Sequence, residues 1–177
     1  MESTTGVQGY YAESAERLGR VYESVSFEEV HGALLDLLPR APARVLDVGA
    51  GTGRDAAALA GRGYTVDAVE PVAELRRVAE RLHPGCGVTW RAGALPEIPG
   101  VRGPYDVVLL SAVWMHLRPE ERPVAMRRLA ALLAPGGLLL ITLRRGERVR
   151  TVVEAPGTLS GPLDEGARVG TVRVYRG

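Results

Sequence analysis

Apolar residues recur along this chain with two spacings, one typical of amphipathic helices and one typical of buried strands. Near the N-terminus, Tyr11 and Leu18 lie at helical spacing with charged residues between them, which predicts a helix over residues 8–24. Further along, short apolar runs alternate with amphipathic or alanine-rich segments. The predicted strands cover residues 44–48, 64–70, 88–91, 105–111 and 138–143, and the predicted helices cover residues 54–61, 71–82 and a segment that opens at Pro119 and ends at Pro135. Such alternation predicts a parallel sheet with helices on both faces.

The segment before the first strand is predicted to form a helical unit. A second helix is predicted to begin after Ser26, because Ser26 and Glu29 match the capping box, in which each side chain bonds to the backbone of the other residue. Pro39 ends its apolar stripe. We therefore predict an N-terminal helical lid over residues 1–40 and one sheet-forming domain over residues 41–177.

The C-terminal part departs from this alternation. Residues 148–153 and 169–175 are predicted as two strands, joined by a stretch rich in Gly and Pro in which no amphipathic helix of normal length fits. A shortened antiparallel hairpin at the edge of the sheet is the simplest arrangement and is predicted to complete the fold.

Composition and charge exclude several classes of protein. The 177 residues suit one domain with a substantial core, and the fractions of 46% apolar and 24% charged residues are those of an ordinary soluble globular protein. The net charge of +1 and the scattered basic residues give no signature of nucleic-acid binding. No apolar run reaches the ~18 residues of a membrane helix. Residues 1–6 have no basic or hydrophobic region, so no secretory signal is expected.

The single cysteine, Cys86, excludes an internal disulfide and a cysteine-rich metal site. No three histidines or carboxylates show metal-ligand spacing, so no metal is expected. A cytoplasmic location is the default expectation.

The most informative segment is the glycine-rich turn after the first predicted strand. Residues 45–53 read Val-Leu-Asp-Val-Gly-Ala-Gly-Thr-Gly, so that an acid, Asp47, is followed by Gly49, Gly51 and Gly53. Glycines permit positive φ angles and a close approach of a ligand to the backbone. Ligands of open α/β sheets bind at this edge of the sheet. A dinucleotide site has the spacing G-x-G-x-x-G, which differs from the spacing here.

The acid followed by three glycines resembles motif I of the class I S-adenosylmethionine (SAM)-dependent methyltransferases. In that family the methionine part of the cofactor lies against this loop. The resemblance covers about residues 8–145 and includes the late signature Leu-Ala-Pro-Gly-Gly over residues 133–137. It implies an α/β fold with a Rossmann-like, doubly wound, mostly parallel sheet. It also implies SAM as the cofactor, with Asp47, Gly49, Ala50 and Gly51 among the residues that bind it.

Glu70 is the second anchor of this interpretation. It ends the second predicted strand 23 residues after Asp47 (70 − 47 = 23). This spacing matches the acid about 20 residues on that accepts hydrogen bonds from ribose hydroxyls. Pro71 follows in the first turn of the next predicted helix and is placed with Glu70 at the cofactor.

Two further segments line up with the same family. The loop after the third strand resembles the segment whose backbone frames the adenine, which implies contacts from Ala94 and Leu95. The family usually has an acid in this loop, where residues 92–93 are Ala and Gly. The segment after the fourth strand resembles motif IV, which places Ser111 and Ala112 beside the cofactor.

Four more side chains are candidates for the cofactor site, with capping or packing of a helix as the alternative. Arg54 is suited to pairing with the methionine carboxylate, and Asp55 either accepts from its ammonium group or caps the helix. Tyr11 and Tyr22 lie on the predicted lid, where similar methyltransferases often place a tyrosine over the cofactor. Packing of an amphipathic helix explains both tyrosines equally well.

His116 is the candidate general base. It follows the fourth strand at the edge of the sheet where ligands bind, and a histidine can take a proton from a hydroxyl or amine near neutral pH. A packing role is the alternative. His31 lies by the apolar stripe of a helix and His83 lies in a turn, and neither is expected to be functional.

Three functions remain in view. The first is methyl transfer from SAM to a small-molecule acceptor by in-line displacement, with the acceptor under the N-terminal helices. The second is a SAM-binding pseudoenzyme or regulatory subunit that acts through a protein partner, favoured by the missing acid of the adenine loop and the short tail. The third is an oxidoreductase on the same sheet order, disfavoured by the glycine spacing. The sequence leaves open the acceptor and the oligomeric state, a homodimer included.

Overall fold

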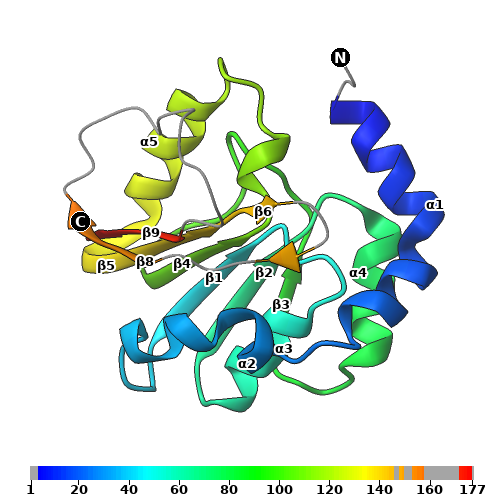
Figure 1. The fold of residues 1–177 in the computed structure, drawn as a ribbon, viewed down its shortest axis with the longest axis horizontal. Coiled ribbons are helices and arrows are strands. Elements are labelled where there is room, and N and C mark those ends of the chain that lie inside the picture. The colour runs from blue at the N-terminus through cyan, green and yellow to red at the C-terminus, as the bar shows by residue number, and fades with distance from the viewer. Residues whose placement is uncertain (1–3, 146–147, 150–152, 158–171, 177) are drawn as a thin grey trace.

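The computed structural model describes the backbone of residues 4–145, 148–149, 153–157 and 172–176, and the side chains of residues 8–143. Within these residues, one sheet has the strand order β3-β2-β1-β4-β5-β9-β8 (Figure 1). Its first five strands in the chain are β1 (Arg44–Val48), β2 (Thr65–Val69), β3 (Thr89–Arg91), β4 (Tyr105–Ser111) and β5 (Leu133–Thr142). They pair in parallel, which confirms the predicted parallel sheet.

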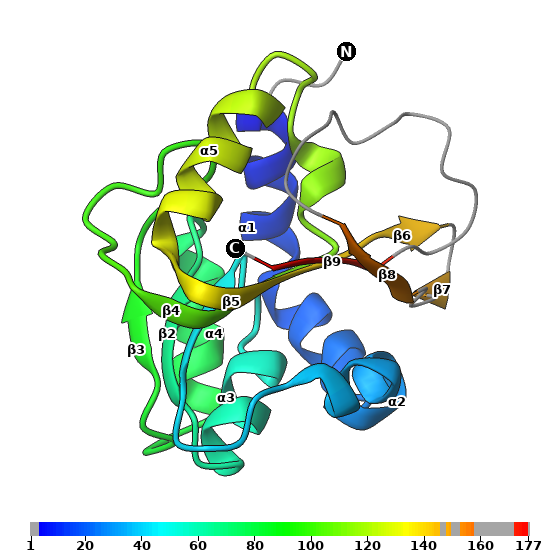
Figure 2. The ribbon, with the colours of Figure 1, turned by 90° about the vertical axis from the view of Figure 1, so that its left-hand side faces the viewer.

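Helices cover both faces of the sheet, as predicted (Figure 1, Figure 2). One face is covered by α2 (Phe27–His31), the 3₁₀ helix η1 (Gly32–Leu37) and α3 (Arg54–Gly61), and the other face is covered by α5 (Arg122–Leu132). The helix α4 (Ala73–Leu82) connects β2 to β3, and α1 (Thr4–Tyr22) packs alongside it. The chain therefore alternates strands and helices around one layered sheet.

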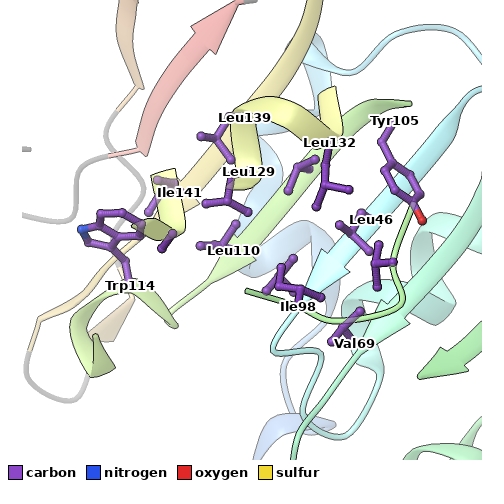
Figure 3. Packing of buried hydrophobic residues seen from close by; sticks show 14 of the residues in the cluster. Leu46, Val69, Ile98, Tyr105, Leu110, Trp114, Leu129, Leu132, Leu139 and Ile141 are labelled. Atoms are coloured by element: carbon purple, nitrogen blue, oxygen red, sulfur yellow. The ribbon is translucent and has the colours of Figure 1, made fainter. Parts of the chain in front are cut away.

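The core between the sheet and α5 is mostly aliphatic, with Tyr105 and Trp114 in the same cluster (Figure 3). Leu46 of β1, Leu110 of β4 and Leu139 of β5 are fully buried in one cluster with Leu129 and Leu132 of α5. Because β4 is covered on both faces, it is apolar almost throughout. This packing holds the carboxyl ends of β1, β2 and β4 in place, where the loops of the candidate site begin.

The helix predicted from Ser26 is shorter than expected. Its capping box is present, with the Glu29 amide donating to Ser26 Oγ at 3.2 Å and the Ser26 amide donating to the Glu29 carboxylate at 2.7 Å. The α-helix nevertheless gives way to 3₁₀ geometry at Gly32, a residue type that weakens a helix interior. His31 therefore stands at a junction, where it is fully buried.

The alternation of strands and helices is also interrupted between β3 and β4. Residues 92–104, between β3 and β4, contain no helix. The short 3₁₀ helix η2 (Trp114–His116) follows β4 and has no counterpart in the predicted elements.

The predicted C-terminal hairpin is wrong in its pairing. The strand β9 (Val172–Arg176) pairs antiparallel with β5, whereas β8 (Val153–Gly157) pairs in parallel with β9. Residues 158–171, which connect them, lie outside the described residues. A separate pair of short antiparallel strands, β6 (Arg144–Arg145) and β7 (Arg148–Val149), precedes them.

Candidate functional site

A cavity lies at the carboxyl ends of β1, β2 and β4, where their loops meet the N-terminal helices. Every residue that the sequence predicts for the cofactor or for catalysis lines this cavity. These residues are Tyr11, Tyr22, Asp47, Gly49, Ala50, Gly51, Arg54, Asp55, Glu70, Pro71, Ala94, Leu95, Ser111, Ala112 and His116. The fold thus brings together segments as far apart as Tyr11 and His116, which are 105 residues apart in the chain.

The glycine-rich turn is tied to the neighbouring strand through its backbone. The amides of Gly49 and Ala50 donate to the carbonyl oxygen of Val69 at 2.7 and 3.0 Å. Gly49 and Gly51 have φ angles of 74° and 58°, in the left-handed region that favours glycine. A Cβ at Gly49 would collide with Val113, whereas no atom lies within 4 Å of the same position at Gly51. Gly51 lines the cavity and therefore leaves open space next to its own backbone.

Asp47 carries a buried carboxylate that lacks a hydrogen bond from the described residues. Its exposed fraction is 1%, and neither oxygen has a partner with hydrogen-bond geometry, although the nearby Ala56 amide lowers the pKa. Burial raises the pKa of Asp47 well above its ordinary value, the Asp55 charge raises it further, and the Arg54 charge opposes this rise. A buried acceptor without a donor calls for an explanation, and a ligand that supplies the donor is one.

Glu70 follows β2 with its carboxylate oriented by two backbone amides. Gly51 donates to Oε2 and Val72 donates to Oε1, both at 2.9 Å. Burial raises the pKa of Glu70, and the two amides together with the Arg76 charge partly offset this effect. Each carboxylate oxygen keeps a further lone pair for a donor in the cavity, as required to accept from two neighbouring hydroxyls.

Asp55 is held by two side chains and does not cap α3. The N-cap residue is Gly53, without a side-chain cap. Asp55 Oδ1 accepts from Arg54 Nε at 2.7 Å, and its Oδ2 lies 2.8 Å from His31 Nε2. Burial raises the pKa of Asp55, but the His31 hydrogen bond and the Arg54 charge outweigh burial and lower the pKa to about 2. Asp55 is therefore ionised at neutral pH.

Two contacts join the N-terminal helices to the loops of the sheet. Arg54 Nη1 donates to the carbonyl oxygen of Tyr22 at 3.3 Å. The Tyr11 hydroxyl lies 3.3 Å from His116 Nε2, and the two rings meet edge to face with centroids 5.9 Å apart. His116 is exposed at the cavity, a position from which it can exchange a proton with a bound molecule.

The remaining predicted residues contribute mainly backbone. Ala112 has a φ angle of 56°, and its amide donates to the carbonyl oxygen and to Oγ1 of Thr142, both at 3.1 Å. This fixes the chain next to Ser111 at the end of β4. Ala94 and Leu95 lie in the loop after β3, and neither brings a charged side chain to the cavity.

The sequence pattern does not reveal His31 as a member of the site. It contacts Asp55 and Ser111, which lie 24 and 80 residues further along the chain. Its position beside an apolar helix stripe is the only signal in the sequence, and that signal favours packing. Gln8 and Thr52 also line the cavity and are not predicted.

Two kinds of site are not seen in the described part of the chain. No group of three or more His, Cys, Asp or Glu side chains there is arranged to hold a metal ion. No helix there is long and apolar enough to cross a membrane.

The sheet order, the glycine-rich turn and the acids near the ends of β1 and β2 define a protein of the SAM-dependent methyltransferase class. Residues 21–154 match the family described as the methyltransferase domain, and the chain belongs to this family. It is 38% identical over 119 residues to an uncharacterized methyltransferase of Mycobacterium tuberculosis (strain ATCC 25618 / H37Rv), a match that covers 67% of this chain and 47% of that protein. The chain spans about half the length of the curated relatives that it first matches.

Solved structures agree with this assignment. A TehB-like SAM-dependent methyltransferase from Corynebacterium glutamicum has the same fold, with a TM-score of 0.64 at 22% identity, covering 78% of this chain and 74% of that one. Phosphoethanolamine N-methyltransferase 2 of Haemonchus contortus, solved with S-adenosylhomocysteine (SAH) and phosphomonomethylethanolamine, is 27% identical with a TM-score of 0.57. That match covers 64% of this chain and 27% of that one. Together with the family, these neighbours establish SAM as the cofactor.

Proposed function

We propose that this chain transfers the methyl group of SAM to a small-molecule acceptor by in-line displacement. The observation that carries the proposal is the buried Asp47 carboxylate without a hydrogen-bond donor, in a cavity that it shares with Glu70 and Gly51. The functional groups of this cavity fit the cofactor. Its carboxylates suit an ammonium group and ribose hydroxyls, its arginine suits a carboxylate, and its glycine backbone leaves room for close approach.

Each part of the cofactor has a matching set of residues. Asp47 and Asp55 are two carboxylates close enough to raise the pKa of the first, so a single ammonium group would relieve their repulsion. Arg54 is assigned to the methionine carboxylate and Glu70 to the ribose. The glycine turn with Ala50, the backbone of Ala94 and Leu95, and the residues Pro71, Ser111 and Ala112 complete the proposed cofactor site, with Tyr11 and Tyr22 above it.

SAM supplies a methyl group on a sulfonium, so the leaving group is already activated. The task of the chain is to hold the acceptor in line, and orientation of this kind supplies about 7–11 kcal/mol of a barrier. Residues 1–40 act as a lid over the acceptor. His116 takes a proton from an acceptor that must lose one. The Tyr11 hydroxyl now faces His116 Nε2, so it must move aside or pass the proton on.

Titration calorimetry with SAM, SAH and NAD tests the cofactor site. Micromolar binding of SAM and SAH, without binding of NAD, is expected. Binding of NAD alone, or of none of the three, would overturn the proposal.

An acceptor screen that follows SAH formation then tests transfer. In that screen His116→Ala is expected to lower turnover about 10²-fold or more while SAM affinity stays within about twofold of wild type. Turnover at the wild-type rate would remove His116 from the mechanism.

A second candidate function has one observation in its favour. The adenine loop has Ala and Gly at residues 92–93, where the resemblance implies an acid, which favours a SAM-binding regulatory subunit that acts through a protein partner. The acceptor screen separates the two functions, because such a subunit would bind SAH yet form none from SAM with any acceptor.

A further inference from the structure

A buried histidine outside the predicted site holds two residues of the cavity. His31 ends α2 and has no exposed surface. Its Nε2 lies 2.8 Å from Asp55 Oδ2 and 3.2 Å from Ser111 Oγ. Asp55 and Ser111 line the cavity, whereas His31 lies behind them and does not.

The short distance to Asp55 decides which ring nitrogen of His31 carries a proton. Without a hydrogen, Nε2 would direct its lone pair at a carboxylate oxygen 2.8 Å away, which is repulsive. Nε2 therefore carries a hydrogen and donates it to Asp55. The longer contact to Ser111 Oγ shares the same hydrogen, so the serine oxygen accepts.

This trio is not a nucleophilic triad, although it consists of Ser, His and Asp. In a triad the acid binds one ring nitrogen and the serine binds the other. Here both contact Nε2, and Nδ1 is buried without a partner among the described residues. His31 cannot take the proton of Ser111 while its Nε2 donates to Asp55. Its role must therefore be to orient its partners.

The contacts of His31 combine packing with orientation. The ring lies 5.1 Å from the Phe27 ring. Its Nδ1 is buried without a partner among the described residues, which is unfavourable, whereas its Nε2 supplies a partner for the buried Asp55 carboxylate. Because removing one partner of a buried pair is destabilising, a leucine would cost stability and would also lose the hydrogen bond that fixes Asp55.

Fixing Asp55 leaves it ready for one kind of ligand. Arg54 uses one lone pair of Oδ1 and His31 uses one of Oδ2, so each oxygen retains a lone pair. The residue is buried, at 5% exposed, and lines the cavity close enough to Asp47 for its charge to raise the Asp47 pKa. Two oriented carboxylates favour a compact cation with several N–H donors.

We infer that His31 is a positioning residue that sets the affinity of the cavity for the amino-acid arm of the cofactor by fixing Asp55. The inference rests on the proposed assignment of Asp55 to the ammonium group of SAM. His31 acts mainly on that arm, because its hydrogen bonds go to Asp55 and Ser111, whereas the residues assigned to the ribose and adenine follow β2 and β3.

The test compares two ligands that differ in this arm. SAH carries it, whereas 5′-methylthioadenosine has the same adenosine and thioether sulfur but no amino-acid group. Calorimetry of His31→Leu is expected to show SAH binding roughly 10- to 100-fold weaker and 5′-methylthioadenosine binding within about threefold of wild type. His31→Gln keeps an N–H donor near the place of Nε2 and is expected to restore most of the SAH affinity.

Two control variants bracket this result. Glu70→Gln is expected to weaken both ligands, because both carry the ribose. His83→Gln removes a histidine that also pairs with a carboxylate, Glu23 at 3.3 Å, but lies outside the cavity lining, and it is expected to leave the ratio of the two affinities unchanged.

Two results would overturn the inference. In the first, His31→Leu weakens both ligands by the same factor, as a merely structural role would. In the second, it leaves SAH binding unchanged although thermal melting shows a folded protein. Wild-type protein that binds neither ligand would instead overturn the proposed function, and the inference with it.

Discussion

At the scale of single residues, Asp47 opposes stability and supports binding. Its folded-state pKa is raised mainly by burial, so its ionised form is disfavoured in the folded protein. The sign follows from linkage: a raised pKa means that the folded state loses stability as the pH rises above the unfolded value of about 4 and through the folded one. The residue is therefore costly for the protein without its ligand.

Asp47→Asn is expected to stabilise the ligand-free protein near neutral pH. The amide has nearly the same shape but no charge, and we expect a gain on the order of 1 kcal/mol, or about 2–4 °C in Tm. The gain should shrink toward pH 4, where Asp47 of the folded wild-type protein is protonated and so carries no charge either. Thermal melting of both proteins between about pH 4 and 7 measures this. A variant that is less stable at every pH would show that a partner such as the Ala56 amide stabilises the Asp47 carboxylate.

At the scale of elements, the site depends on close packing between the turn after β1 and the segment after β4. A Cβ at Gly49 would meet Val113, and the φ angle of Gly49 is 74°. Gly49→Ala therefore adds both a collision and backbone strain, and we expect a loss on the order of 2–4 kcal/mol in the free energy of unfolding, with weaker SAH binding.

Adding Val113→Ala to the Gly49→Ala variant is expected to relieve the collision but not the backbone strain. The unfolding free energies of the two single variants and the double variant form a cycle whose coupling term isolates the contact between the two segments. Additive losses would mean that the two segments separate freely, and the cavity would then owe its shape to other contacts.

The sequence predicts contacts that follow from the order of the strands, but not contacts that depend on tertiary packing. Asp47 and Glu70 could be placed at one site because the carboxyl ends of parallel strands share an edge of the sheet. The contacts of His31 could not, since its partners are brought to it by tertiary packing. The pairing of β8 with β9 depends likewise on which segment occupies the edge beside β5, and turn residues alone do not decide that.

At the scale of the whole molecule, polar contacts around one cavity join segments from across the chain. Arg54 contacts Tyr22, His31 bridges Asp55 and Ser111, and Tyr11 contacts His116. A ligand that fills this cavity therefore stabilises the N-terminal helices, the turn after β1 and the segment after β4 together. Its binding should appear as a shift of one cooperative melting transition.

The pH dependence of that shift is expected to distinguish the ligands. The ammonium group of SAH favours ionised Asp47, so SAH affinity should rise as the pH rises through the folded-state pKa of Asp47. Asp55, with its pKa lowered to about 2, stays ionised throughout and adds no pH dependence. At a fixed excess of ligand, the rise in Tm caused by SAH should therefore be larger above the folded-state pKa of Asp47 than below it, and a series of melting curves across pH measures this.

5′-Methylthioadenosine serves as the control for this measurement. It carries the same ribose as SAH, so a pH dependence from the raised pKa of Glu70 appears with both ligands, and only the additional rise with SAH is assigned to Asp47. Asp47→Asn should remove this additional rise. A wild-type SAH shift with the same pH dependence as the 5′-methylthioadenosine shift would contradict the assignment of Asp47 to the ammonium group.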